Sequence, residues 1–578
     1  MHVNLFSILI ALVALFATVH SAYIWPLPQN FSQGNKTVGI AKDFKIVVQG
    51  EGANLDILRA AANRYEELII NEKWAWKVKW APTPVNSSGD AMSRQNMIQV
   101  GPAEFQLDGV QVTVEDANQS IGLTTDESYV LEITAEEGSK ATIQAKTVYG
   151  AIHGLETLSQ LVSMNKGELV IAYAPWHIED RPRFPHRGIM IDVARNFLPV
   201  EDLKRTIDGM SFAKFNVLHL HLSDQTSYSL ASEIYPHLRE KSYDVDVPGF
   251  IYTSNDIKEL VQYAHERAIR IIPEIEMPGH AFAMGSAFPD MLICPNVQPD
   301  WRALEPQPPT GEINISNSAS MEIIRNIIHE VASWFPDASI HLGGDEVGLK
   351  CYKQDPKFQQ YLNSTGSTVK DAMQNFTDQI VGFAKAVNKT VHVWQEVLLN
   401  KELNLTVPDV VAQGWTSSDD TIALVKLGHK VVASPGNYWY LDCGHGKHAA
   451  GWIESGAWCD PYKTWQRMYT YNPIANLTEE ESKHVLGGEV PLFSEQVDSV
   501  NLDRMIWPRT AAAGEVLWSS NTAIDYNDPF GSVKRAYPRI QELRHRLIHR
   551  YKIAAEPISP LWCVTHMGWC DLPKGYEK

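Results

Sequence analysis

Positive charge is scarce in this sequence, which has 50 lysine and arginine residues against 68 aspartate and glutamate residues and a formal net charge of -18 with histidine neutral. A surplus of negative charge repels phosphate groups, so neither nucleic acid nor an anionic membrane is expected as the main partner. Long apolar runs are missing after the N-terminal segment, so no membrane span is expected there. A chain of 578 residues with 44% hydrophobic residues predicts a globular protein of two or three domains.

Cysteine is also rare, with 6 residues in the whole chain. None of them has the CxxC or Cys/His spacing that is typical of zinc sites, so no metal is expected. Their even number predicts disulfides, although the sequence allows many connectivities. We expect pairing in sequence order because each pair then encloses a modest loop: Cys294–Cys351, Cys443–Cys459 and Cys563–Cys570.

The N-terminus carries one apolar run, Leu5 to Val19, followed by the small residues Ser21 and Ala22. Its length fits a signal peptide over residues 1–22 that is removed on secretion, although only His2 stands where a basic residue is usual. An uncleaved anchor is the alternative. We therefore expect an extracellular protein, with an acidic vacuole or a lysosome-like compartment as a further possibility. Sequons that agree with secretion begin at Asn30, Asn35, Asn86, Asn118, Asn314, Asn363, Asn375, Asn388, Asn404 and Asn476.

Residues 23–183 have a mixed pattern that predicts a small α+β domain. A helix is expected over Tyr149–Leu161, where apolar residues recur at helical spacing. The proline-rich stretch Asp180–Pro185 marks the expected boundary. The strands expected before it are Phe44–Val48, Met97–Val100, Gln111–Val114 and Ala141–Ala145.

From residue 184 to the C-terminus, short apolar runs alternate with longer helical patterns such as Ser254–Ala268, Met321–Trp334 and Val369–Ala386. Eight such runs in alternation predict a parallel (β/α)8 TIM barrel. The expected barrel strands are Gly188–Asp192, Asn216–Leu222, Arg270–Glu276, Ala338–Gly343, Val391–Gln395, Val410–Gln413, Lys430–Ser434 and Val485–Glu489.

The ends of these strands carry the candidate chemistry. After the strand that ends near His341, two glycines allow a tight turn and two adjacent carboxylates follow, Asp345 and Glu346. Taken alone, an Asp-Glu pair more often caps a helix. The other strand ends, however, also bear acids and aromatic residues, and this combination favours sugar binding because indoles stack on pyranose rings and carboxylates accept hydrogen bonds from hydroxyls. These residues are Asp192, Arg195, Asp224, Glu276, His280, Trp394, Glu396, Trp415, Tyr440, Asp442 and Glu495.

In these residues the chain resembles the β-N-acetylhexosaminidases of glycoside hydrolase family 20, with motifs in family order across nearly the whole mature sequence. Two later segments, Tyr440–Gly446 and Trp458–Pro461, most resemble the secreted fungal branch. The resemblance implies a zincin-like α+β domain over 23–183 and a TIM-barrel catalytic domain with a C-terminal extension over 184–578. The motifs are Gly154–Gln160, Arg187-Gly188, His219–Leu222, Pro273–Glu276, Pro278–His280, Gly343–Glu346, Trp394–Glu396, Tyr440–Asp442 and Trp507–Arg509.

The resemblance also implies a mechanism without a protein nucleophile, in which the substrate's 2-acetamido oxygen attacks the anomeric carbon and forms an oxazolinium-like ion. Glu346 then acts as general acid and base, and Asp345 holds the acetamido N–H and stabilises the developing positive charge. Tyr440 aims the acetamido oxygen, while Trp394 and Trp415 wall the acetyl methyl group. No cofactor is implied.

The remaining roles implied by the resemblance concern recognition and support. Arg195 and Glu495 bind the outer hydroxyls of a terminal sugar, with Asp442 as a further contact. Asp224 and His280 form a relay behind Glu346, and Asp192 and Glu396 support their neighbours. Three positions depart from the usual family residues, namely Phe493 in place of a tryptophan at the floor of the sugar pocket, Asn196 in place of a histidine, and Glu276 in place of an aspartate.

The function expected from these residues is that of an exo-acting, retaining β-N-acetylhexosaminidase that removes terminal GlcNAc or GalNAc from chitooligosaccharides and glycoconjugates. N-acetylhexosamine-terminated oligosaccharides are its expected partners, and the family implies a homodimer. Two alternatives remain open at this point: a barrel glycosidase that releases disaccharides, and a sugar-binding glycoprotein without catalysis.

Overall fold

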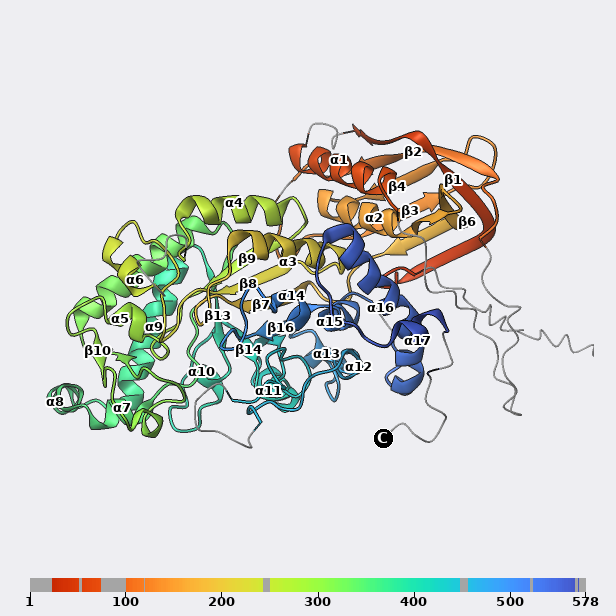
Figure 1. Cartoon of the computed structure of the whole chain (residues 1–578). Coiled ribbons are helices and arrows are strands. Elements are labelled where there is room, and N and C mark those ends of the chain that lie inside the picture. The colour runs from red at the N-terminus through yellow and green to blue at the C-terminus, as the bar shows by residue number, and fades with distance from the viewer. Residues whose placement is uncertain are drawn as a thin grey trace, which may run out of the picture.

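The computed structural model describes residues 23–50, 55–73, 100–118, 120–242, 250–447, 456–519, 523–566 and 570. The expected signal peptide, the sequon at Asn86 and residues 97–99 of the predicted strand Met97–Val100 lie outside this set. Figure 1 shows a small N-terminal unit of sheet and helices beside a larger barrel, with the long C-terminal helix α16 (Pro529–Tyr551) lying against both. None of the helices among the described residues is both long enough and apolar enough to cross a membrane.

The N-terminal unit is a six-stranded sheet in the order β1-β2-β4-β3-β6-β5. Buried and exposed side chains alternate along β2, β3 and β4, and the buried face packs against two helices, α1 and α2. The expected helix and the expected strands in the described part are confirmed, whereas α1 and three further strands, β3, β5 and β6, are additions. The bounds are β1 Asn30–Gln49, α1 Asp56–Ile70, β2 Phe105–Val114, β3 Tyr129–Ile133, β4 Ala141–Ala145, α2 Val148–Leu161, β5 Val162–Asn165 and β6 Glu168–Asp180.

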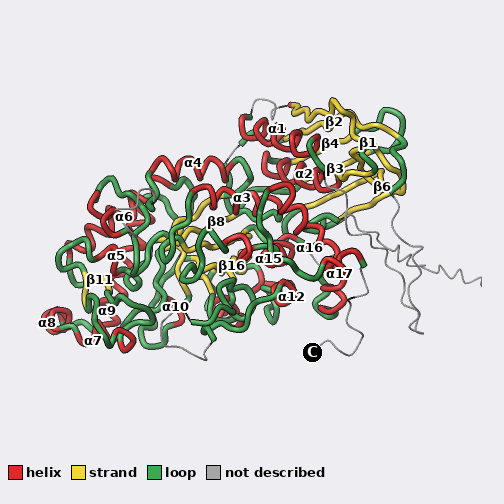
Figure 2. Tube along the Cα trace, viewed as in Figure 1, coloured by secondary structure: helices red, strands yellow, loops and turns green. Residues whose placement is uncertain are grey.

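The second unit is a closed barrel of eight parallel strands in the cyclic order β7-β8-β9-β12-β13-β14-β15-β16, surrounded by helices (Figure 2). Each of the eight predicted strands is present to within a few residues, so the predicted TIM barrel is confirmed. The strands are β7 His186–Asp192, β8 Val217–His221, β9 Arg270–Glu274, β12 Ser339–His341, β13 Thr390–Trp394, β14 Val411–Gly414, β15 Lys430–Ala433 and β16 Val485–Leu492.

Helices connect the barrel strands, and α9 coincides with its predicted range. A short hairpin, β10 (Leu292–Ile293) with β11 (Glu312–Ile313), lies in the connection between β9 and β12. The helices are α3 Val200–Phe212, η3 Pro236–Lys241, α4 Ser254–His265, α5 Phe282–Gly285, η4 Trp301–Ala303, α6 Ser318–Trp334, α7 Leu349–Gln354, α8 Pro356–Thr365, α9 Val369–Ala386, α10 Glu396–Leu399, α11 Ser418–Lys426, α12 Trp465–Tyr469, α13 Glu479–Ser482, α14 Leu502–Ile506, α15 Arg509–Trp518 and α17 Leu561–Thr565.

Buried ion pairs join the two units. Arg187, at the start of barrel strand β7, donates two hydrogen bonds of 2.9 and 2.7 Å to the Glu127 carboxylate of the N-terminal unit. Nearby, the Lys214 ammonium lies 2.9 Å from Asp180 at the end of β6. Because breaking one partner of a buried pair leaves an uncompensated charge, these contacts fix the relative position of the two units.

Two of the three predicted disulfides are confirmed, Cys443–Cys459 and Cys563–Cys570. The prediction for Cys294 and Cys351 is wrong in this structure, because both are free thiols. The fold does bring these two thiols close enough to interact.

Two buried carboxyl groups, Glu305 and Glu312, anchor the connection between β9 and β12. Glu312 accepts a hydrogen bond of 2.7 Å from the backbone of Gly348, just past the predicted catalytic pair, and Glu305 accepts one of 2.6 Å from Gly311. Burial raises the pKa of Glu305 to about 7. Burial, and to a smaller extent the nearby Glu305 carboxylate, raise the pKa of Glu312 to about 8. Both groups are therefore protonated in mildly acidic solution.

From these two carboxyl groups we predict that the free energy of unfolding falls as pH rises. Glu312 has an ordinary pKa of 4.5 and a folded-state pKa of about 8, so its protonation stabilises the folded state fully below pH 4.5, and the stabilisation is lost as pH rises through about 8. Glu312→Gln keeps the oxygen that faces Gly348 but never ionises. The drop in Tm between pH 5 and pH 8 should therefore shrink by roughly 1–4 °C relative to the unmodified protein. An unchanged drop, equal to that of the exposed control Glu479→Gln, contradicts the expectation.

Candidate active site

The predicted catalytic pair lies on a tight loop at the end of β12. Gly343 and Gly344 have φ values of +64° and +96°, and a Cβ atom on Gly343 would come within 1.8 Å of the Glu276 carboxylate. Glycine is therefore required here for both backbone conformation and space. Glu346 itself has a φ of +49°, a conformation that is uncommon for a residue with a side chain and that tends to occur at functional sites.

The two carboxyl groups differ in environment. The Asp345 side chain is 14% exposed and that of Glu346 is 33% exposed, so Glu346 is the group that solvent and a leaving group reach more easily. Burial raises the pKa of Asp345, the imidazolium of His280 opposes this shift, and the neighbouring Glu346 adds to it. The charge of Asp345 therefore depends on a nearby positive charge.

A chain of charged groups leads away from the pair. His280 Nε2 lies 3.4 Å from Glu346 and 3.8 Å from Asp345, while its Nδ1 contacts Asp224 at 3.3 Å. Burial disfavours the charged imidazole, but the carboxylates of Asp224 and Asp345 outweigh it and raise the pKa of His280 well above its usual value. The expected relay behind Glu346 is present as a connected set of contacts.

Asp224 also connects this relay to Arg195, one of the residues predicted to bind the sugar. Its Oδ2 atom lies 2.7 Å from Arg195 and 2.8 Å from His221 Nε2. Burial alone raises the pKa of this carboxyl, but the Arg195 guanidinium and the His280 imidazolium lower it far below its usual value. Asp224 is thus a permanent buried anion whose charge holds three cationic side chains in place.

Arg195 and Glu495 lie on one side of the site, as expected. The Arg195 guanidinium contacts Asp192 at 3.2 Å and lies 5.3 Å from the centre of the Phe493 ring. Phe493 therefore lines the cavity with its ring against the guanidinium, and its role as the floor of a sugar pocket stays a prediction. Asn196, the second departure from the family pattern, fixes the loop through hydrogen bonds to Ser494.

The aromatic residues divide into two groups. Trp415 lines the cavity and donates its indole N–H to both oxygens of Glu396 at 2.9 Å. Tyr440 lies beside it, with ring centres 6.1 Å apart. Trp394 is only 1% exposed and its N–H is bound to Glu274 at 2.6 Å, so it lies beneath the pocket and does not line the described cavity.

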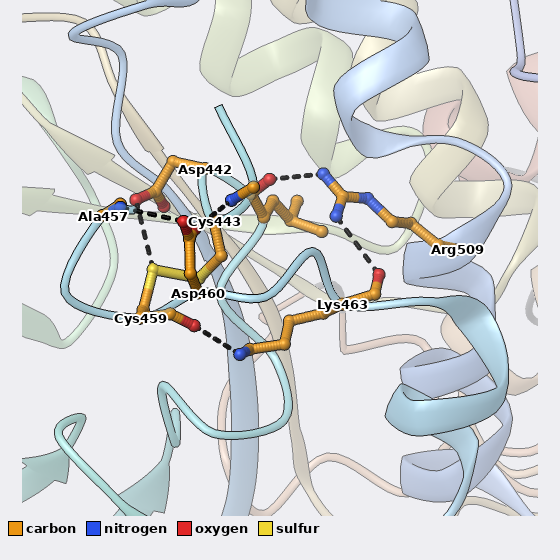
Figure 3. Close-up of a disulfide and its surroundings, with 9 residues drawn as sticks. Asp442, Cys443, Ala457, Cys459, Asp460, Lys463 and Arg509 are labelled. Carbon is orange, nitrogen blue, oxygen red and sulfur yellow. Dashed lines mark hydrogen bonds between the residues drawn. A yellow bond between two sulfur atoms is a disulfide. The ribbon is translucent and has the colours of Figure 1, made fainter. Parts of the chain in front are cut away.

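The Cys443–Cys459 disulfide fixes the loop that carries Asp442 (Figure 3). Arg509 donates to the backbone oxygens of Leu441 and Lys463, the latter at 3.2 Å, and Lys463 donates to the backbone of Cys459. Asp442 therefore points into the cavity from a rigid segment. Burial and the nearby Glu495 carboxylate raise its pKa to about 7.

These side chains converge on one cavity of about 310 Å³, a size suited to one small ligand. Several buried polar atoms in it, among them Arg195 Nε, Asp345 Oδ1 and Asp442 Oδ1, have no hydrogen-bond partner among the described residues. Because buried polar groups are normally paired, these atoms have unmet hydrogen-bonding capacity next to the cavity. A neighbouring cavity of about 320 Å³, which Glu346 also lines, has mostly apolar side chains in its wall, among them Met373, Phe376 and Ile380 of α9, and suits a hydroxyl-rich ligand less well.

Metal-ligand atoms also approach one another in the site. His280, Asp345 and Glu346 offer atoms within 4.8 Å, as do His219, Glu274 and His341 in the barrel interior. In both groups the atoms are already paired as histidine–carboxylate contacts, for example His341 with Glu274 at 2.9 Å. The expectation that no metal is needed stays a prediction.

The sequence reasoning missed several residues of the cavity wall. Gln307 donates a hydrogen bond of 2.9 Å to Glu495, and the indole of Trp458, 54% exposed, packs edge-on against Trp415 with ring centres 4.9 Å apart. Trp301 and His445 complete the rim. They belong to loops without periodicity, and the sequence marked His445 and Trp458 only as members of the two segments that resemble the fungal branch.

Comparisons with known proteins agree with this geometry. Residues 184–521 match the family model "Glycosyl hydrolase family 20, catalytic domain", and residues 24–161 match "beta-acetyl hexosaminidase like". A beta-hexosaminidase of Emericella nidulans is 34% identical over 98% of both chains, and the beta-hexosaminidase subunit beta of Felis catus is 31% identical over 96% of this chain and 98% of its own.

Solved structures give the same result. The X-ray structure of a Flavobacterium johnsoniae chitobiase superimposes with a TM-score of 0.69 at 28% identity, over 92% of this chain and 74% of the other. The beta-N-acetylhexosaminidase of Streptomyces coelicolor A3(2) has a TM-score of 0.68 at 23% identity, covers 93% of this chain and 98% of its own, and shares the fold. From its motifs, its barrel and these matches, the chain belongs to glycosyl hydrolase family 20.

Proposed function

We propose that the protein is an exo-acting, retaining β-N-acetylhexosaminidase that removes single terminal GlcNAc or GalNAc residues from chitooligosaccharides and glycoconjugates. One observation carries this proposal: a single cavity holds the Asp345–Glu346 pair together with the Arg195 and Glu495 side chains. An acid pair suits cleavage of a glycosidic bond, while a guanidinium and a carboxylate suit the outer hydroxyls of a terminal sugar. The relatives named beta-hexosaminidase support the same activity.

In the first step the acetamido oxygen of the substrate forms a bond to the anomeric carbon as the bond to the leaving oxygen breaks. Glu346 gives its proton to the leaving oxygen, and its greater exposure places it toward the leaving group. Asp345 accepts a hydrogen bond from the acetamido N–H. As that amide becomes positively charged, the ionised form of Asp345 is favoured and stabilises the cyclic ion.

In the second step a water molecule attacks the anomeric carbon and reopens the ring. Glu346, now ionised, takes a proton from this water and returns to its starting form. Two displacements at one carbon give net retention. The contact between His280 and Glu346, backed by Asp224, keeps a histidine side chain beside the acid in both steps.

Two rival functions fit the site less well. Release of disaccharides requires a cleft that extends past the outer hydroxyls, whereas Arg195, Gln307 and Glu495 form one linked side of the cavity. A binding protein without catalysis needs no acid pair supported by a charged relay.

We further propose that the protein is secreted and glycosylated and acts as a homodimer. The apolar N-terminal run and eight exposed sequon asparagines in the described residues support the first two of these.

The central prediction concerns the acid pair. Asp345→Asn and Glu346→Gln should each reduce kcat for 4-nitrophenyl N-acetyl-β-D-glucosaminide by about 10²–10⁴-fold, because each removes a charge or a proton that the transition state requires. Steady-state kinetics on variants with unchanged Tm measures this loss. The exposed Glu479→Gln serves as the matched control. Turnover near that of the unmodified enzyme in either pair variant would refute the assignment.

Phe493 generates a prediction about substrate affinity. Its ring has less stacking area than the tryptophan usual at this position, so Phe493→Trp should lower KM for the same substrate by about two- to tenfold. Phe493→Leu removes the aromatic face and should raise KM. If KM is equal in all three proteins, the ring does not contact the sugar.

Asn314 is the one described sequon asparagine that is buried, with 7% of its surface exposed. Its Nδ2, the atom to which a glycan would be attached, donates to the Asp290 backbone oxygen at 3.5 Å, so a glycan would displace this contact and the packing around it. Peptide mapping by mass spectrometry of the secreted protein should find glycans on exposed sequons and none on Asn314. A glycan on Asn314 in folded, active protein contradicts the structure.

A further inference from the structure

Gln307 lies between the two charged residues that face the outer hydroxyls of the sugar. Its Nε2 donates to Glu495 Oε1 at 2.9 Å, and its Oε1 accepts from Arg195 Nη2 at 3.4 Å. No direct ion pair of 4.0 Å or less joins Arg195 to Glu495 among the residues that the structure describes. The neutral amide therefore separates a buried cation from an anion that would otherwise attract each other across the pocket.

This separation matters for ligand binding. A direct Arg195–Glu495 ion pair in a half-buried pocket would have to be broken before a hydroxyl could insert between the two groups. The amide bridge offers a weaker, neutral contact on each side. Replacing the contacts of this amide with contacts to a sugar hydroxyl costs less free energy than breaking an ion pair. Both charged groups therefore stay available to the ligand.

The amide also has unused hydrogen-bonding capacity. The contacts to Arg195 and Glu495 use one N–H and one oxygen lone pair, and an amide side chain has two of each. A donor and an acceptor side by side match a sugar hydroxyl, which both donates and accepts. Gln307 lines the cavity, so this capacity faces the ligand space.

The loop that carries Gln307 is held rigidly, which gives the amide a defined position. Thr310 donates to the Cys294 carbonyl at 2.8 Å and accepts from the Val297 amide at 2.8 Å. On the other side, Lys350 donates to the Ala303 carbonyl at 3.0 Å, and the buried Glu305 carboxyl accepts from Gly311. A group positioned in this way recognises a ligand without reordering itself.

We propose that Gln307 is a specificity-determining residue of this pocket: it sets the spacing of Arg195 and Glu495 and contacts the hydroxyl at carbon 4 of the terminal sugar. GlcNAc and GalNAc differ only in the configuration of that hydroxyl. An amide bridged between the two charges that face the outer hydroxyls is placed to distinguish the two orientations. The inference rests on the proposed function, since it assigns the bound sugar to this class.

The test compares Gln307→Leu, which keeps the size of the side chain without its hydrogen bonds, with Gln298→Leu, an exposed glutamine of the same loop outside the cavity. Both are assayed with the 4-nitrophenyl β-glycosides of GlcNAc and GalNAc. Gln307→Leu should raise KM by about tenfold with a smaller change in kcat, and the ratio of kcat/KM for the two epimers should move toward one. Gln298→Leu should leave all of these values unchanged.

A second variant and a second measurement guard against misfolding and inactivity. Gln307→Glu keeps the shape but places a carboxylate beside Glu495, and it should also raise KM. Binding of free GlcNAc and GalNAc, followed by tryptophan fluorescence because Trp415 lines the cavity, tests recognition without turnover. The dissociation constants of Gln307→Leu should rise and converge for the two sugars.

The possible outcomes distinguish a failure of the proposed function from a failure of the inference about Gln307. Failure of the unmodified protein to hydrolyse either glycoside overturns the proposed function, while sugar binding still tests Gln307. Unchanged KM, epimer ratio and dissociation constants in folded Gln307→Leu overturn the inference and leave the proposed function intact. A uniform loss of kcat with an unchanged epimer ratio also overturns it, because Gln307 then acts only through the shape of the loop.

Discussion

The buried carboxylate of Asp224 is the interaction on which the rest of the site depends. An isolated charge in this position would be strongly unfavourable, so its contacts with Arg195, His221 and His280 are required for the fold as well as for function. These partners come from the ends of three neighbouring strands, β7, β8 and β9. One anion therefore fixes the distance between the Arg195 guanidinium and the histidine beside Glu346.

The catalytic loop is constrained from the opposite side by steric contact. The short strand β12 ends in a turn that only glycine can form, and the Glu276 carboxyl fills the space that a side chain on Gly343 would need. Burial, and to a smaller extent the nearby Asp345 carboxylate, raise the pKa of Glu276 well above its usual value. Glu276 is therefore a neutral support for the turn. The loop thus holds Asp345 and Glu346 at different depths, which is the physical basis for the different roles that we propose for them.

The sequence predicted the parts of this molecule that have a regular pattern. The barrel strands are continuous apolar runs, and helix α9 has both helical spacing and a capping box at Thr368, so their positions could be read from the chain. Strand β6 and helix α1 were missed, although α1 buries one regularly spaced face with Leu58, Ala61, Ala62, Tyr65 and Ile69. The strand-end acids were found because strand ends meet at one face of a barrel. Gln307 could not be found in this way, because its partners lie 112 and 188 residues away in the sequence and its loop has no periodic pattern of apolar residues. Trp394 is buried, bonds to Glu274 and does not line the described cavity, so its predicted contact with the acetyl group stays a prediction.

The central claim is that the substrate's own acetamide acts as the nucleophile and that Asp345 directs it. The most direct test replaces the acetyl group of 4-nitrophenyl N-acetyl-β-D-glucosaminide with mono-, di- and trifluoroacetyl groups. Fluorine withdraws electrons and weakens the carbonyl oxygen as a nucleophile with little change in size. We predict that kcat/KM falls steeply and continuously along the series. A rate that is independent of fluorine substitution would contradict the account, because it would require a nucleophile supplied by the protein.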